Sequence, residues 1–393
     1  MKEVVIAGAV RTPIGRFGGA LAGMTPGELG AAAVAEALRR ANVPPAQVQD
    51  VAFGCARQAG ARPNVARQAA YWAGVPQEVP AFTINMACGS GLKAIDHAFR
   101  CVRDDDAEIV VAGGVEVMSR VPYLLPNARW GLRMGDEPVV DAMYQDGFLC
   151  PLSGMIMGET AERLAEMFQI TREEQDAFAL RSQERAARAL KDGAFEAETF
   201  TMRLKGKKQD VELRQDEHPR PETSLASLAK LPPVFKQSGS VTAGNSSGIT
   251  DGAAAMVVLS RERAAALGLK PMARILGVAA AGVDPHIMGI GVVPAVRRLL
   301  EKLSLRLDAF GLVEVNEAFA AQVIACDREL GFDPERLNVK GGAIALGHPI
   351  GASGARITVT LLHEMARRNV RLGLASLCIS GGMGLAAAYE RIP

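Results

Sequence analysis

The sequence predicts an α/β fold made of two similar halves, with a long irregular segment inserted between them. Short apolar segments alternate with amphipathic helical segments near both ends of the chain, which is typical of strands connected by helices. The order of these segments repeats in the second half, whereas the alternation is lost in the middle. At 393 residues the chain also exceeds the usual size of one hydrophobic core, so we expect more than one domain.

The first half begins with an apolar strand and continues as alternating helices and strands. The expected elements are a strand at Val4–Val10, a helix at Glu28–Arg40, a strand at Val51–Gly54, a helix at Asn64–Trp72, a helix from Leu92 to Val102 and a strand at Ile109–Ala112 that ends at Gly113-Gly114. Because strands and helices alternate, we expect a largely parallel sheet with helices on both faces.

The middle of the chain has a different character. Ser119–Asn245 is rich in proline and loops, and we interpret it as a surface insertion. Two helices are expected within it, and the second begins at the capping box Thr171-Arg-Glu-Glu174.

The second half repeats the order of the first. Cys88-Gly-Ser-Gly91 leads into a helix, a strand and the glycine pair 113–114. Likewise Ala352-Ser-Gly354 leads into a helix, the strand Leu374–Ile379 and the pair Gly381-Gly382. This order indicates an internal duplication of one α/β unit.

Composition excludes several classes of protein. Lys and Arg (44) nearly balance Asp and Glu (43), which gives no electrostatic reason to expect nucleic acid or an anionic membrane as partner. No apolar run approaches the ~20 residues of a membrane span, and the first apolar run is short for a signal peptide, so we expect a cytoplasmic protein. The six cysteines include no C-x-x-C pair, so we expect no metal site and no disulfide framework.

The segment Gly341–Arg356 has an unusual density of glycine, with five in 16 residues. Glycines before a helix suggest a phosphate site at first. However, the segment matches neither the P-loop pattern nor the dinucleotide fingerprint. It contains His348, the one histidine embedded in glycine-rich backbone; we expect the other four to be structural or solvated.

Cys88 is the first candidate nucleophile, because it lies at the first turn of an expected helix. A helix dipole contributes up to ~2 kcal/mol, which lowers a thiol pKa by at most ~1.5 units. Full activation therefore requires a base, for which His348 is the candidate.

Two more residues follow strands. Cys378 precedes a glycine turn whose backbone N–H groups resemble those of an oxyanion hole, so it is a second reactive candidate. Asn316 is either a functional amide or the N-cap of a helix that starts at Glu317.

Four motifs in order resemble the thiolases, and within that family the acetyl-CoA C-acetyltransferase branch. They are Asn85-Met-Ala-Cys88-Gly-Ser-Gly91, Val315-Asn316-Glu-Ala-Phe319, Gly347-His348-Pro-Ile-Gly-Ala-Ser-Gly354 and Cys378-Ile-Ser-Gly-Gly-Met-Gly384. The resemblance extends from Arg11-Thr-Pro-Ile-Gly15 to the C-terminus.

The resemblance implies duplicated βαβαβαββ halves in a layered α/β/α/β/α core with an inserted loop domain. The implied N-terminal half is 1–118 and 250–271, the loop domain 119–249 and the C-terminal half 272–393. It also implies a homo-oligomer, either a dimer or a tetramer.

The resemblance further implies a role for each candidate. Cys88 becomes acylated, His348 activates it and donates a hydrogen bond to a thioester oxygen, and Asn316 holds a water that supplies the partner hydrogen bond. Cys378 exchanges the proton of the second acetyl-CoA, and the backbone N–H groups of Cys88 and Ser380 form a second oxyanion hole.

Coenzyme A is expected on the loop domain, as a substrate rather than a cofactor, and no cofactor is expected. The implied contacts of CoA and the acyl group are Met157, Arg220, Ser227, Phe235, Ala243, Ser247, Met288 and Phe319. Three positions depart from the family pattern: Ser380 replaces a common glycine, Ile156 a histidine and Val292 a proline. The substitutions at Ile156 and Val292 affect which length of acyl chain is expected to be preferred.

The implied reaction is the reversible condensation of two acetyl-CoA to acetoacetyl-CoA and CoA. The first alternative is a 3-ketoacyl-CoA thiolase that cleaves longer chains in β-oxidation. A decarboxylating ketoacyl synthase is disfavoured because such enzymes lack a second reactive cysteine like Cys378. A thiolase-like binding protein without turnover is disfavoured by the intact set of Cys88, Asn316, His348 and Cys378.

Overall fold

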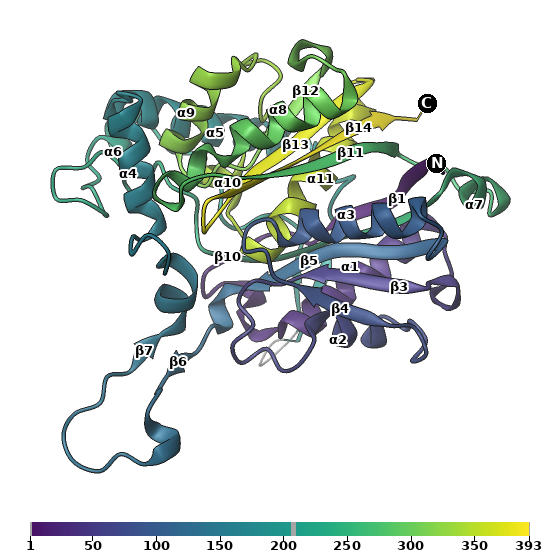
Figure 1. Ribbon diagram of the computed structural model, residues 1–393, viewed down its shortest axis with the longest axis horizontal. Helices are drawn as coiled ribbons and strands as arrows, with labels where there is room; N and C mark the ends of the chain where they lie inside the picture. Colours follow the sequence, from purple (N-terminus) through teal and green to yellow (C-terminus); the bar gives the residue numbers. More distant parts are fainter. Residues whose placement is uncertain (1, 206–209, 393) are drawn as a thin grey trace.

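The computed structural model describes residues 2–205 and 210–392. Its centre is a ten-stranded sheet with the strand order β12-β13-β14-β11-β1-β10-β5-β3-β4, and β2 (Gly15–Arg16) pairs with β10 (Figure 1). The two halves of the sheet meet where β1 pairs antiparallel with β11, with Val5 opposite Arg274 and Ile6 opposite Ala273.

The N-terminal half contributes five strands and three helices to this core. The strands are β1 (Val4–Arg11), β3 (Asp50–Gly54), β4 (Ala81–Ile84), β5 (Ile109–Val117) and β10 (Thr250–Ser260), and the helices are α1 (Pro26–Ala41), α2 (Val65–Trp72) and α3 (Ser90–Arg103). A capping box at Thr25 and Glu28 starts α1, and Asn64 caps α2.

The C-terminal half repeats this order. Its strands are β11 (Ala273–Gly282), β12 (Leu312–Val315), β13 (Leu372–Ile379) and β14 (Met383–Arg391), and its helices are α8 (Val292–Leu303), α9 (Ala320–Leu330), α10 (Ala343–Leu346) and α11 (Ile350–Arg367). The order β11-β14-β13-β12 matches β1-β10-β5-β3 strand for strand, which confirms the predicted duplication. A short helix, α7 (Arg261–Ala266), links the two halves.

Three hydrophobic clusters divide the core into five layers, as predicted. One lies between α1, α2 and the first half-sheet, and another lies between α8, α9 and the second. The cluster between them is formed by α3 and α11, which pack together between the two half-sheets (Figure 1). Residues of α11 are almost all buried, so it is the central helix of the molecule.

Two expectations about the sheet are wrong. The sheet is mixed: β3 pairs in parallel with β4 and β5, and β12 with β13, but the central pairs are antiparallel. The strand β5 also does not end at Gly113-Gly114 but continues to Val117. These glycines allow close packing instead of a turn, because a Cβ on Gly114 would lie 2.2 Å from the carbonyl oxygen of Gly351.

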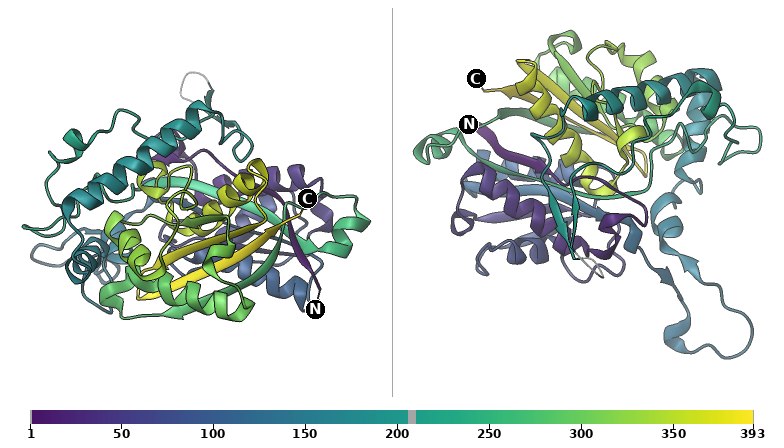
Figure 2. Two further views of the ribbon diagram at one scale, coloured as in Figure 1. Left: turned by 90° about the horizontal axis from the view of Figure 1, so that it is seen from above. Right: turned by 180° about the vertical axis from the view of Figure 1, so that it is seen from behind.

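The segment between β5 and β10 contains the two expected helices and short irregular pieces. These are β6 (Tyr123–Leu124), β7 (Val140–Asp141), α4 (Met157–Met167), α5 (Arg172–Lys191), β8 (Met202–Leu204), β9 (Val211–Leu213) and α6 (Leu225–Leu228). The capping box at Thr171 is present. The β6–β7 region projects away from the body (Figure 2). Within the described residues, no helix is long and apolar enough to cross a membrane.

A fully buried ion cluster ties the inserted segment to both halves. Glu198 accepts hydrogen bonds from Arg11 Nε (2.7 Å), Lys340 Nζ (2.6 Å) and Thr360 Oγ1 (2.9 Å). Burial acts to raise the pKa of Glu198, but Lys340 and Arg11 outweigh it and lower the pKa to about 2. Since Lys340 begins the segment that contains His348, this cluster holds that segment in place.

We expect Glu198→Gln to destabilise the protein by about 3 kcal/mol at pH 7, because the buried Lys340 and Arg11 each lose one counter-charge, although Arg11 keeps Asp216 and Lys340 keeps Glu364. A carboxylate whose pKa is lowered by folding stabilises the protein above its unfolded pKa of ~4.3. The difference between wild type and variant should therefore shrink as pH falls from about 4.5 towards 2, measured by urea unfolding. Glu212→Gln, at an exposed ion pair, is the matched control and should leave the urea midpoint almost unchanged.

Candidate active site

Cys88 lies in the tight turn between β4 and α3, two residues before the helix begins, and not within its first turn as predicted. The preceding residue, Ala87, has a positive φ of 44°, a conformation that costs free energy for a residue with a Cβ. Ser90 holds this turn, because its hydroxyl donates to the carbonyl oxygen of Ala87 (2.6 Å) and accepts from the N–H of Met86 (2.9 Å). The thiol is thereby fixed on rigid backbone.

His348 comes from the other half of the molecule and contacts this thiol. Its Nε2 lies 3.3 Å from Cys88 Sγ, and its Nδ1 lies 2.5 Å from the hydroxyl oxygen of Ser353. The Ser353 hydroxyl donates its single proton to the carbonyl oxygen of Pro349 (2.9 Å), so towards His348 it acts as an acceptor. Nδ1 therefore carries the imidazole proton, and the lone pair of Nε2 faces the thiol.

Electrostatics keep this pair neutral. Burial, together with the positive charges of Arg356 and Arg57, lowers the pKa of His348 to about 3. Burial raises the pKa of the Cys88 thiol, and Arg57 and the backbone N–H of Ser380 oppose this only in part. A neutral thiol next to a neutral imidazole is the resting arrangement from which a base removes a proton as the sulfur attacks.

Glu116 joins the loop that follows β3 to the start of α11, close to His348. This fully buried carboxylate on β5 accepts hydrogen bonds from the backbone N–H groups of Ala56 (3.0 Å), Arg57 (3.0 Å) and Gly351 (2.8 Å). Gly351 lies in the first turn of α11, where a carboxylate is favoured by the helix dipole. One side chain of the first half thus anchors the His348 segment of the second.

Cys378 lies near the end of β13, and the turn to β14 follows it. Burial raises the pKa of Cys378 well above its ordinary value, and the nearby Cys88 adds to this effect, so Cys378 is a thiol at rest. Positive φ values fall on Gly381 (86°) and Gly382 (83°) and not on Ser380. The turn therefore accepts the Cβ of Ser380 without strain, and the backbone N–H of Ser380 acts to lower the pKa of the Cys88 thiol.

Asn316 follows β12 and is completely buried. It is not an N-cap, because α9 begins only at Ala320 and its N-cap is Phe319; that alternative was wrong. Among the described residues, neither the oxygen nor the nitrogen of its side-chain amide has a protein hydrogen-bond partner. Burying an amide without hydrogen-bond partners costs free energy, so a protein that keeps one at a fixed position usually uses it for function.

The candidate residues surround one cavity of about 610 Å³. It is lined by three reactive side chains, Cys88, His348 and Cys378, together with Ser380 and the predicted contact residues Met157, Arg220, Phe235, Ala243, Ser247, Met288 and Phe319. Within the described part of the chain, Asn316 and Ser227 do not line it. Of the departures from the family pattern, Ile156 lines the cavity, whereas Val292 is buried at the start of α8.

Sequence reasoning missed several residues of this site. Arg57, which lines the cavity and affects both Cys88 and His348, carries no recognisable motif. Ser353 was visible within the glycine-rich motif, and its spacing of five from His348 could have suggested a contact across the helix start. His218, expected to be structural or solvated, forms a hydrogen bond between its Nδ1 and the carbonyl oxygen of Ala345 (2.8 Å), and it also lines the cavity, which was not expected.

Comparison with known proteins gives consistent matches over the full chain. The family model of the thiolase N-terminal domain matches residues 4–262, and that of the thiolase C-terminal domain matches residues 269–391. An acetyl-CoA acetyltransferase of Syntrophomonas wolfei is 52% identical, with all of both chains covered. The crystal structure of the Bacillus anthracis acetyl-CoA acetyltransferase superposes with a TM-score of 0.98 at 47% identity, covering 100% of this chain and 99% of that one. The human mitochondrial 3-ketoacyl-CoA thiolase superposes with a TM-score of 0.97 at 42% identity, with the same coverage.

We expect Ser353→Ala to slow alkylation of Cys88 by iodoacetamide about tenfold at pH 7.5, because the base is misplaced rather than removed. In the wild type the alkylation rate should keep rising above pH ~8.5, the ordinary thiol pKa, because burial raises the pKa of Cys88. Mass spectrometry of the Cys88 peptide measures the alkylation rate of the variant and the pH dependence of the wild-type rate. Thr358→Val removes another buried hydroxyl from α11 and serves as the control. Equal slowing in both variants would contradict a specific role for Ser353.

Proposed function

Because the chain belongs to the thiolase family, we propose that it is an acetyl-CoA C-acetyltransferase, which condenses two acetyl-CoA to acetoacetyl-CoA and CoA in a reversible reaction. The observation that carries this proposal is the placement of a thiol–imidazole pair, Cys88 and His348, and a second thiol, Cys378, on one cavity. One thiol can hold the acyl group while the other exchanges a proton.

In the first half-reaction Cys88 is the nucleophile. His348 Nε2 removes the thiol proton as the sulfur attacks the thioester carbonyl of acetyl-CoA, and the same proton then leaves with CoA as its free thiol. The products are an acetyl-Cys88 thioester and CoA. The bond from His348 Nδ1 to Ser353 keeps the imidazole aimed at the sulfur through both transfers.

In the second half-reaction Cys378 removes a proton from the α-carbon of another acetyl-CoA, and the resulting carbanion attacks the acetyl group on Cys88. The new C–C bond forms as the C–S bond to Cys88 breaks. Since burial keeps Cys378 as a thiol at rest, its resting form is the proton donor needed in the cleavage direction. For condensation Cys378 must first release this proton to solvent; it regains a proton from the α-carbon, and the Cys88 thiolate freed by C–S cleavage takes up one proton from solvent to restore the resting enzyme.

Two sets of donors are suited to the negative charge that develops on the thioester oxygens. One is the pair of backbone N–H groups of Ser380 and Cys88, both of which act to lower the pKa of the Cys88 thiol. The other is His348, whose Nε2 can donate once it has taken the thiol proton of Cys88, with the buried Asn316, whose amide we propose holds a water molecule that completes the pair. The unsatisfied amide atoms of Asn316 support this assignment.

We propose that residues 119–249 form the unit that binds CoA, between an N-terminal half of residues 1–118 and 250–271 and a C-terminal half of residues 272–393. The return of β10 to the first half-sheet at Thr250 supports these limits. Arg220 lines the cavity and offers a guanidinium for a CoA phosphate. Phe235 and Phe319 meet edge to face at 6.0 Å and shape the route towards the thiols.

We also propose that the protein is a homo-oligomer. The projecting β6–β7 region exposes large side chains, including Tyr123 (67% exposed), Trp130 (82%) and Met134 (98%), which favours burial against another copy. The strand β4 also leaves one edge of the sheet unpaired. Light scattering of the purified chain would contradict this if it gave the mass of a monomer.

The alternative is a 3-ketoacyl-CoA thiolase acting on longer chains. Two observations support this alternative: the similarity to the human mitochondrial enzyme and the apolar side chain of Ile156 on the cavity wall. The two functions share their chemistry and differ in the space next to the acyl group.

We expect CoA-dependent cleavage of acetoacetyl-CoA with a kcat/KM at least about tenfold above that for 3-ketodecanoyl-CoA, because one apolar pocket discriminates by ~1–3 kcal/mol. The rate at which the 3-ketoacyl-CoA absorbance falls measures the cleavage of each substrate. Equal or faster turnover of the longer chain would favour the alternative. Turnover of neither would favour a binding protein without catalysis, and Cys88→Ala gives the background.

We expect Cys378→Ala to form acetyl-enzyme from acetyl-CoA but not to condense it, whereas Cys88→Ala forms no adduct. The physical reason is that the acyl acceptor and the proton acceptor are different thiols of one cavity. Intact-protein mass spectrometry detects the added acetyl group. Absence of the adduct in Cys378→Ala, with the fold intact by circular dichroism, would refute this division of roles.

A further inference from the structure

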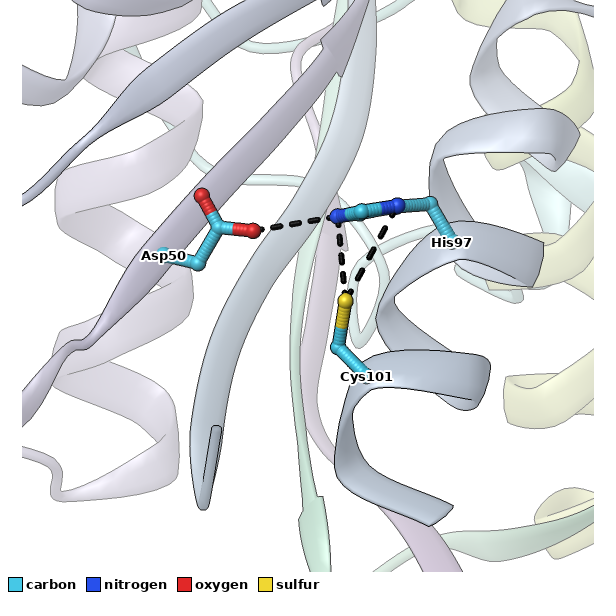
Figure 3. A group of neighbouring side chains, drawn as sticks. All are labelled: Asp50, His97 and Cys101. Carbon is cyan, nitrogen blue, oxygen red and sulfur yellow. Dashed lines mark hydrogen bonds and ion pairs between the residues drawn. The ribbon is translucent and has the colours of Figure 1, made fainter. Parts of the chain in front are cut away.

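We propose that Asp50, His97 and Cys101 form a binding site for one zinc ion. Asp50 is the first residue of β3, and His97 and Cys101 are four residues apart on α3, so their side chains share one face of that helix (Figure 3). None of the three lines the cavity described above. The proposal is therefore independent of the proposed function.

The three donor atoms are already gathered at one point. His97 Nε2 lies 3.0 Å from Asp50 Oδ2 and 3.2 Å from Cys101 Sγ, and all the donor atoms lie within 4.8 Å of one another. In a tetrahedral zinc site, with Zn–S bonds of about 2.3 Å and Zn–N and Zn–O bonds of about 2.0–2.1 Å, the sulfur and nitrogen lie about 3.5 Å apart and the nitrogen and oxygen about 3.3 Å. Cys101 Sγ also lies 3.8 Å from His97 Nδ1, so the sulfur sits beside the imidazole ring. To bind an ion held at Nε2, the Cys101 side chain must turn towards the front of Nε2, in addition to a separation of the donor atoms by about 0.3 Å.

Neighbouring groups orient two of the ligands. The other carboxylate oxygen of Asp50, Oδ1, accepts a hydrogen bond from the N–H of Val51 (2.8 Å), which turns Oδ2 towards His97. The ring of Phe82 packs against the imidazole of His97 in an edge arrangement, with centroids 4.7 Å apart at 88°. Such outer contacts fix ligand geometry at metal sites.

The mixture of sulfur, nitrogen and oxygen donors selects the ion. Zinc binds all three donor types, whereas Ca²⁺ and Mg²⁺ require oxygen ligands. The side chains of His97 and Asp50 are 31% and 17% exposed, so a solvent molecule can complete a four-coordinate shell. The absence of C-x-x-C spacing, from which we expected no metal site, does not exclude this site because it uses one cysteine and draws Asp50 from another element.

The test is a zinc titration of the full-length, metal-free protein against a chromophoric chelator, with variants at the three positions. We expect one zinc ion per chain, with affinity reduced at least about tenfold in His97→Ala, Cys101→Ser and Asp50→Asn. His286→Ala is the matched control, because His286 forms a similar pair with Asp284 (2.7 Å) but has no cysteine in that pair, and it should bind zinc like wild type. Unchanged thermal midpoints of the metal-free variants show that they are folded.

Cobalt distinguishes this site from the Cys88–His348 pair, which also offers a thiol and an imidazole. Bound Co²⁺ gives a thiolate charge-transfer band in the near ultraviolet. We expect the band to persist in Cys88→Ala and to disappear in Cys101→Ser. The reverse pattern, zinc affinities unchanged by all three ligand substitutions, or no zinc binding by the wild-type protein would each overturn the proposal.

Discussion

The site depends on the close approach of two helix starts, α3 and α11, from opposite halves of the molecule. Glycine makes this approach possible: a Cβ on Gly354 would lie 2.5 Å from the backbone nitrogen of Leu92, and one on Gly91 would lie 2.9 Å from that of Ala355. Glu116 then fixes the relative position of the two halves by bonding to the first turn of α11. This approach of the two helix starts brings Cys88 Sγ within 3.3 Å of His348 Nε2, although the two residues lie in different halves.

The glycines of residues 341–356 therefore serve packing and not phosphate binding. Gly351 and Gly354 lie inside α11, and a Cβ on Gly351 would lie 2.7 Å from the Cα of Cys55. Only Gly341 and Gly347 have positive φ values within this segment, at 76° and 99°. The second of these immediately precedes His348 and turns the chain towards the thiol.

Burial controls the chemistry of the site as well as its geometry. The same desolvation that lowers the pKa of His348 raises the pKa values of both thiols, so all three groups rest uncharged. Burial also raises the pKa of the Glu314 carboxyl to about 8, even though Nη1 of Arg356 lies 3.9 Å from its Oε2. Reacting groups that rest uncharged are suited to a reaction whose negative charge develops only on the way to the transition state.

The residue pattern was sufficient to predict the duplicated α/β architecture, the reactive pair Cys88 and His348, and Cys378, because these depend on local periodicity and on motifs that are contiguous in the chain. The mixed direction of the central strands could not be predicted in this way. Gly113 and Gly114 were misinterpreted as the end of a strand for the same reason: what they contact is Ala254, Phe53 and Gly351, which are distant in sequence.

By itself, therefore, the sequence determined which residues were candidates for the chemistry and where many, though not all, of the strands and helices lie. Only the tertiary structure decided that Arg57 and Glu116 belong to the site, that Ser353 sets the tautomer of His348, and that Asn316 is a buried amide and not a helix cap. The physical reason is that hydrogen-bond partners and desolvation are set by residues brought together across the two halves. A sequence motif identifies the reacting group but does not show which residues surround it in the folded protein.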